Sequence, residues 1–91
     1  MSTIVTDNRQ RSRFELVENG LTAFANYQRK GTSLVISHVE SPPALRGKGT
    51  AARLMEGITA IAEAENLKVT PLCSYAALWF RRHPDRAGIL A

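Results

Sequence analysis

The segment Arg46-Gly47-Lys48-Gly49-Thr50-Ala51 joins a predicted strand to a predicted helix. The residues before it, 33–40, are rich in β-branched and apolar side chains, which favours a strand. From about Gly49 to Glu65, apolar residues recur at helical spacing and form one apolar stripe. The segment therefore predicts a turn from the carboxyl end of a strand into the amino end of a helix.

Upstream of this segment, the sequence predicts an antiparallel meander. Alternating apolar and polar residues favour strands over 13–18 and 21–29. The pair Asn19-Gly20 between them is a strong hairpin signal, because both residues tolerate positive φ. Lys30-Gly31 is expected to form the next turn. The third strand, 33–40, is expected at the centre of the sheet.

Downstream of the helix, the pattern predicts one more strand and one more helix. Asn66 is expected to end the first helix in a left-handed conformation, and residues 68–73 are typical of a short strand. Because a helix joins this strand to the third, the two should be parallel, with a right-handed crossover. Ser74 is expected to cap a last helix over 75–82. The predicted order βββαβα is an α/β (α+β) fold with one sheet and one helical layer.

Composition limits the class of protein. The 91 residues, 44% hydrophobic and 22% charged, fit one globular domain. No apolar run approaches the roughly 20 residues that cross a bilayer, and the first residues lack the layout of a signal peptide, so we expect a cytoplasmic protein with no membrane partner. One cysteine and two histidines exclude a disulfide framework and offer too few ligands for a metal site. Residues 1–10 are polar and aperiodic and predict a flexible tail, followed by one domain over 11–91.

The segment 46–51 has the composition of an anion site. The first N–H groups of a helix lack intrahelical partners, and the helix dipole adds partial positive charge. Glycines at 47 and 49 would let a pyrophosphate approach the backbone, while Arg46 and Lys48 add full charges.

Three phosphate-binding loops are compatible with such a composition to different degrees. The spacing does not fit the loop of nucleoside-triphosphatases. The dinucleotide fingerprint G-x-G-x-x-A fits superficially, but Leu72 and Cys73 stand where that fold requires an acidic residue. The third interpretation is a loop for the pyrophosphate of coenzyme A.

The same segment resembles the R/Q-x-x-G-x-G/A signature of the GNAT acetyltransferase superfamily. The chain also resembles a family of small stand-alone GNAT-like proteins, over about residues 21–85. That resemblance rests on the stretches His38-Val39-Glu40-Ser41, Pro71-Leu72-Cys73-Ser74-Tyr75 and Arg82-His83-Pro84. It implies a minimal GNAT-like fold, acetyl-CoA as the cofactor and transfer of acetyl to an amine acceptor of unknown identity.

The resemblance also implies which residues contact the cofactor. The pyrophosphate would be held by the loop and helix start, namely Arg46, Gly47, Lys48, Gly49, Thr50 and Ala51. Val39 and Ser41 would offer backbone groups to the pantetheine arm, where the third and fourth strands splay apart. Val39, Ser41 and Ser74 replace the family's usual Thr, Val and Pro, and none of the three lies in the loop.

Four residues are candidates for the chemistry. Cys73 stands at a strand end before a helix, where the dipole favours a thiolate; it is either a nucleophile that carries acetyl or a buried small hydrophobe. His38 and Glu40 share a strand face and form either a general base with its orienting carboxylate or a solvated strand end. Tyr75 either protonates the departing thiolate or packs in the core.

The alternative is a non-catalytic module that binds coenzyme A or nucleic acid through a basic surface. The formal net charge of +4 and the cluster Arg9, Arg11 and Arg13 are compatible with it. A nucleic-acid site should also show interleaved exposed aromatic residues, and none is evident, so we expect no nucleic-acid partner. The oligomeric state stays open between a monomer and a weak homodimer.

Overall fold

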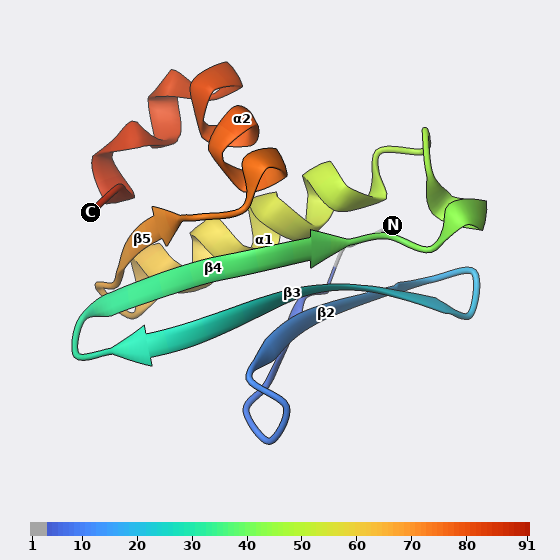
Figure 1. Ribbon diagram of the computed structural model, residues 1–91, viewed down its shortest axis with the longest axis horizontal. Coiled ribbons are helices and arrows are strands. Elements are labelled where there is room, and N and C mark those ends of the chain that lie inside the picture. Colours follow the sequence, from blue (N-terminus) through green and yellow to red (C-terminus); the bar gives the residue numbers. More distant parts are fainter. Residues whose placement is uncertain (1–3) are drawn as a thin grey trace.

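A single mixed sheet forms the frame of the molecule, and its strands lie side by side in the order of the chain (Figure 1). The computed structural model describes residues 4–91. The first four strands are antiparallel, and the last two, joined through a helix, are parallel. The strands are β1 (Thr6–Asn8), β2 (Arg13–Glu18), β3 (Leu21–Lys30), β4 (Ser33–Glu40) and β5 (Lys68–Pro71).

The helices cover one face of this sheet (Figure 1). Helix α1 (Thr50–Ala64) contacts β2, β3, β4 and β5, and α2 (Ser74–Arg82) lies beside it against β4 and β5. Two 3-10 turns complete the chain: η1 (Pro43–Leu45) before α1, and η2 (Pro84–Ile89) after α2. The molecule therefore has an α+β architecture with one sheet layer and one helical layer.

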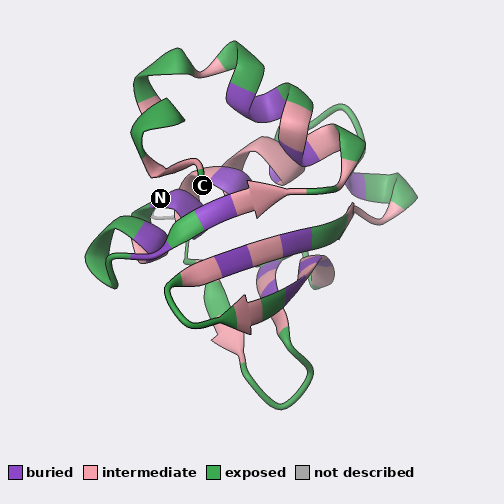
Figure 2. Ribbon diagram, turned by 60° about the vertical axis from the view of Figure 1, so that its left-hand side comes forward, coloured by how far each residue is buried: buried purple, intermediate pink, exposed green. Residues whose placement is uncertain are grey.

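The core lies between the sheet and the helices, because each strand and helix turns a regularly spaced set of side chains inward. Every second side chain of a strand faces the helices, so buried residues alternate with partly exposed ones along β2, β3 and the first half of β4 (Figure 2). Helix α1 supplies the other half of the core from one stripe. The buried residues include Phe14, Leu16, Ala23, Ala25, Leu34, Ile36 and Val69 from the sheet and Leu54, Met55, Ile58 and Ala62 from α1.

Most of the predicted elements are confirmed. Strands stand at 13–18 and 33–40, and β4 and β5 are parallel. Asn19 and Asn66 both have positive φ, at 52° and 56°, as the hairpin and the helix end required. Strand β5 ends at Pro71, two residues before its expected end, because the N–H groups of the next two residues both turn to one carbonyl oxygen of β4.

Three expectations are wrong. Residues 6–8 are not a loose tail but form β1, which pairs with β2; residues 1–3 of that tail lie outside the described residues. With β1 present, β3 rather than β4 is the middle strand. Ser74 is the first residue of α2, and Cys73, still extended at φ −68° and ψ 136°, is the N-cap, without a side-chain cap.

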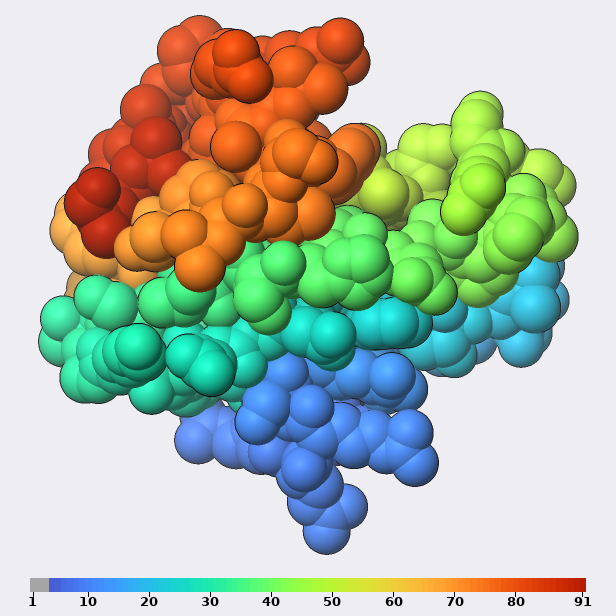
Figure 3. All heavy atoms as spheres, in the orientation of Figure 1, coloured from blue at the N-terminus to red at the C-terminus, as the bar shows by residue number. Residues whose placement is uncertain are grey.

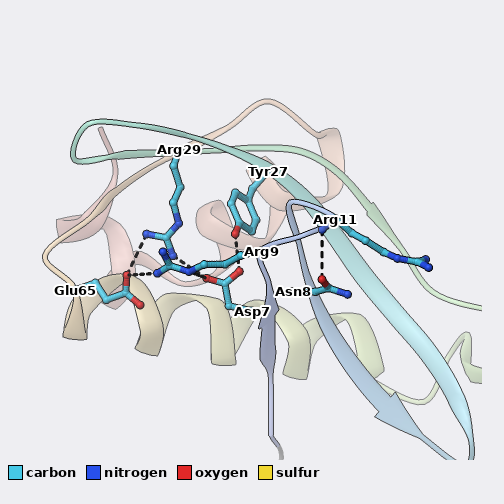
Figure 4. Close-up of polar contacts among 7 residues, drawn as sticks. All are labelled: Asp7, Asn8, Arg9, Arg11, Tyr27, Arg29 and Glu65. Atoms are coloured by element: carbon cyan, nitrogen blue, oxygen red, sulfur yellow. Dashed lines mark hydrogen bonds and ion pairs between the residues drawn. The ribbon is translucent and has the colours of Figure 1, made fainter.

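A cluster of charged side chains holds β1 in place (Figure 4). The Asp7 carboxylate accepts hydrogen bonds from the Tyr27 hydroxyl and from Arg29 Nη2, the latter at 2.8 Å. Arg29 Nη1 donates to Glu65 Oε1 at 3.0 Å, and Arg9 lies 3.3 Å from Asp7. These contacts join β1, β3 and the end of α1, so they supply tertiary support that a three-residue strand lacks by itself.

Segments near both ends of the described chain lie along the outer strands. On one side β1 pairs with β2. On the other, Leu90 forms a parallel bridge with Val69 of β5, and the Ala91 N–H donates to the Val69 carbonyl at 2.9 Å.

Close packing between Val5 and α1 depends on a glycine. A Cβ atom placed on Gly57 would lie 2.1 Å from Val5 Cγ2 and 2.6 Å from Val5 Cβ. Gly57 therefore gives Val5 a slot in the helix surface, although glycine is a poor helix former.

We expect Gly57→Ala to lower the free energy of unfolding by about 1–3 kcal/mol, because overpacking outweighs the gain in helix propensity of about 1 kcal/mol. Adding Val5→Gly should remove the clash and make the two changes non-additive. Urea unfolding of the two single variants and the double variant measures this. A stabilised Gly57→Ala variant would show that Val5 does not occupy the slot.

Candidate functional site

The connection from β4 to α1 is a compact loop. Pro42 and Pro43 end the ladder of β4, and the buried Leu45 anchors the η1 turn, donating its N–H to the Pro42 carbonyl at 2.9 Å. Gly47 and Gly49 both have left-handed φ values, 76° and 79°, which side chains with a Cβ rarely adopt. The two glycines let the chain fold back tightly before α1 begins.

The amino end of α1 is suited to an anion. Gly49 is its N-cap and offers no side-chain cap, and the first turn contains no acidic residue. The exposed side chains of Arg46 and Lys48 flank Gly47 just before this helix end. Unpaired N–H groups, the helix dipole and two cations therefore act at one place.

A pocket of about 210 Å³ lies between this loop, the first turn of α1 and α2. Figure 3 shows the hollow between α2, in orange, and the yellow-green loop before α1. The Ser41 hydroxyl oxygen is buried without a hydrogen-bond partner among residues 4–91. The lining residues are Ser41, Leu45, Arg46, Gly47, Gly49, Thr50, Ala51, Ala52 and Tyr75, so most of the predicted cofactor residues meet here. Val39 and Lys48 are not among the lining residues: Val39 packs against the core, and the side chain of Lys48 is exposed.

Strands β4 and β5 part beside this pocket (Figure 1). They pair only from Ser33 to Ile36, and the Ile36 carbonyl accepts the N–H groups of both Leu72, at 2.9 Å, and Cys73, at 3.2 Å. The pairing with β3 also shifts here, which leaves Ser37 as an extra residue in β4. Residues 37–40 of β4 thus continue without a partner in β5.

Cys73 and Tyr75 come just after β5 in the chain, on the side of the gap opposite β4. Both residues are half-buried and pack against the core, but only Tyr75 is also among the lining residues of the pocket. Burial raises the pKa of the Tyr75 phenol, and the cation of Arg82 partly offsets this increase. The phenol is protonated at neutral pH, as an ordinary tyrosine is, and presents an O–H group to the pocket.

His38 and Glu40 form a pair on the opposite face of the sheet. Val39 packs into the core, so its neighbours on either side point away from the helices. His38 Nε2 lies 3.0 Å from Glu40 Oε1, and both side chains are more than half exposed. The structure thus brings this pair together but does not place it in the pocket lining.

A second cluster of polar side chains, not predicted from the sequence, holds the start of α1. The Glu18 carboxylate accepts hydrogen bonds from Thr50 Oγ1 at 2.6 Å and from Arg53 Nε and Nη2 at 2.7 and 2.8 Å. These bonds lower the pKa of Glu18 to about 2, with Arg53 the largest cause. Because Glu18 is 32 and 35 positions from its partners, no local pattern signals the contact.

Two other kinds of site were searched for within residues 4–91. No helix there is long and apolar enough to cross a membrane. No three or more histidine, cysteine, aspartate or glutamate side chains come together in that range as metal ligands.

Comparison with known families bears on this arrangement of loop, pocket and splayed strands. The sequence model of the GCN5-related N-acetyl-transferase family matches residues 13–89. The chain belongs to this family. The resemblance inferred from the sequence is thereby confirmed, and the α+β fold with its parallel β4–β5 pair is a minimal GNAT fold. A search of curated proteins found no match. The matched region begins at β2, so β1 lies before it.

The environment of Tyr75 yields a test. Replacing Arg82 by glutamine should raise the pKa of Tyr75 further, because the guanidinium cation favours the phenolate. Titration of tyrosines labelled at Cζ, followed by NMR and assigned with Tyr75→Phe, measures it. Tyr27 is an internal control, since burial and Asp7 raise its pKa without a contribution from Arg82. An unchanged or lower Tyr75 pKa would contradict the placement of Arg82 near the phenol.

Proposed function

We propose that this GCN5-related N-acetyltransferase binds acetyl-CoA in the pocket at the start of α1 and transfers the acetyl group to an amine. The observation that supports this most is the convergence of the left-handed glycine loop, the uncapped start of α1 and the Tyr75 phenol on one pocket. A pyrophosphate needs backbone N–H donors and cations, and the loop supplies both.

The residues present fit coenzyme A at other points too. The buried, unpartnered hydroxyl of Ser41 would gain a hydrogen-bond partner from a polar ligand. Residues 38–40 of β4 pair with β3, but residues 37–40 have no strand partner on the β5 side, so an extended arm could pair with their backbone there. On this proposal Arg46, Lys48 and residues 47–51 hold the phosphates, and Val39 and Ser41 lie beside the arm.

Acetyl-CoA supplies an activated thioester when bound, so the protein must orient it and move protons. The amine nitrogen attacks the thioester carbon, the carbon–sulfur bond breaks, and the protonated Tyr75 phenol gives its proton to the departing thiolate. His38, oriented by Glu40, is our candidate to accept the proton that the amine loses. We favour direct transfer because Tyr75 is among the lining residues of the pocket and Cys73 is not.

The binding half of the proposal is tested by calorimetric titration with acetyl-CoA. Wild-type protein should bind saturably, and a Gly47→Asp, Gly49→Asp variant should bind about a hundredfold more weakly, because two carboxylates would repel the pyrophosphate. The matched control is Gly31→Asp, Gly88→Asp. It adds the same charges at two glycines outside the pocket lining where a Cβ would meet nothing within 4 Å, and Gly31, like the loop glycines, has positive φ. Equal losses in both variants, or no wild-type binding, would overturn the proposal.

The chemical half is tested by two substitutions measured under steady-state conditions with an amine acceptor. Tyr75→Phe should lower kcat by about a hundredfold, the scale of general-acid catalysis, with little change in the Kd of acetyl-CoA. Cys73→Ala should retain turnover. Loss of turnover in Cys73→Ala, together with an acetylated thiol in mass spectra of the wild type, would instead establish a covalent route through Cys73.

A further inference from the structure

We propose that Glu18 and Arg53 are positioning residues for the loop 46–49 before α1, the cofactor loop. They fix the backbone on both sides of Gly49 in the conformation that binds the pyrophosphate. This inference rests on the proposed binding of acetyl-CoA. Neither residue lines the pocket, so both act through the residues that they hold.

The contacts reach each neighbour of Gly49. Arg53 Nη2 donates to the Lys48 carbonyl at 2.9 Å, on one side of the glycine. On the other side, Thr50 donates its hydroxyl to Glu18 at 2.6 Å, and its side chain is almost completely buried. The Glu18 carboxylate in turn binds Arg53 through two nitrogens, a geometry that fixes the guanidinium in direction as well as in distance.

Glu18 and Arg53 both lie outside the loop that they hold. Glu18 is the last residue of β2, and Arg53 stands one turn into α1, so the loop is tied to two regular elements of the fold. The guanidinium also lies over the glycine, since a Cβ on Gly49 would meet Arg53 Nη1 at 3.0 Å. Residues held in this way present their free N–H groups in one arrangement, which lowers the cost of ordering them on binding.

A positioning role and simple charge repulsion predict opposite changes in acetyl-CoA affinity when Glu18 is replaced. A carboxylate beside an anion site repels the ligand, so from charge alone Glu18→Gln should tighten binding. If Glu18 instead positions the loop, its loss should weaken binding in spite of the more favourable net charge. The two expectations have opposite directions.

The experiment measures the Kd of acetyl-CoA and of S-acetylpantetheine, which lacks the pyrophosphate, for wild type and Glu18→Gln. We expect acetyl-CoA to bind Glu18→Gln about tenfold more weakly, while S-acetylpantetheine binds both proteins equally. The control is Glu63→Gln, which removes the same charge from the far end of α1, where Glu63 contacts Arg86 at 3.2 Å. This control should leave the Kd unchanged or slightly lower.

A second variant covers the case in which Glu18→Gln unfolds. Arg53→Lys keeps the charge but loses the two-nitrogen contact, and it too should weaken acetyl-CoA binding selectively. If the wild type binds acetyl-CoA and these variants bind it equally well or more tightly, the positioning role alone is overturned. The same follows if the variants lose equal affinity for acetyl-CoA and S-acetylpantetheine. Absence of acetyl-CoA binding by the wild type would overturn the proposed function and this inference with it.

Discussion

The carbonyl of Ile36 is the point on which the architecture depends, because it accepts the N–H groups of both Leu72 and Cys73. One acceptor serving two consecutive donors cannot continue a regular parallel ladder, so β5 turns away while β4 runs on. The chain leaves β4 toward α1 and leaves β5 toward α2 at the same edge of the sheet. The helix start, the glycine loop and Tyr75 consequently surround one opening, as expected at the carboxyl ends of parallel strands.

The single helical layer explains how the remaining polar residues are divided. With helices on only one face, the pocket between α1 and α2 belongs to that face. His38 and Glu40 lie on the other face, which none of the described helices covers. His38 and Glu40 stand on the part of β4 that has no partner in β5, at the place where the two strands part. In our proposal, cofactor and acceptor therefore meet across the sheet rather than on one side of it.

Local patterns predicted the elements whose residues are adjacent in sequence. The alternation in 13–18 and 33–40 and the left-handed Asn19 and Asn66 follow from rules that operate over a few residues. The loop was predictable for the same reason, since its glycines and cations are contiguous. The strand β1 was not, because its three residues show no alternation and Asp7 depends on Tyr27 and Arg29 of β3, which are 20 and 22 positions away in sequence.

The candidate site divides in the same way. The pocket residues from 46 to 51 could be inferred from one segment, and Tyr75 from the resemblance to a family. The support from Glu18 could not be inferred, because an isolated glutamate before an Asn-Gly turn is typical of any hairpin. Its pairing with Arg53 exists only once β2 and α1 are packed together. The capping role predicted for Ser74 was wrong because α2 begins at Ser74 itself, one residue earlier than predicted.

The segments at 6–8 and 89–91 have a consequence for how copies of this protein meet. An open strand edge offers rows of unpaired amide and carbonyl groups to any other chain, and such edges promote aggregation. Here one outer side of the sheet is closed by a strand of only three residues, and the other is partly occupied by Leu90 and Ala91 along β5. A neighbouring molecule could extend the sheet over a long stretch only by first displacing one of these segments. These two short segments thus limit the length of strand edge that is open to pairing with a second molecule.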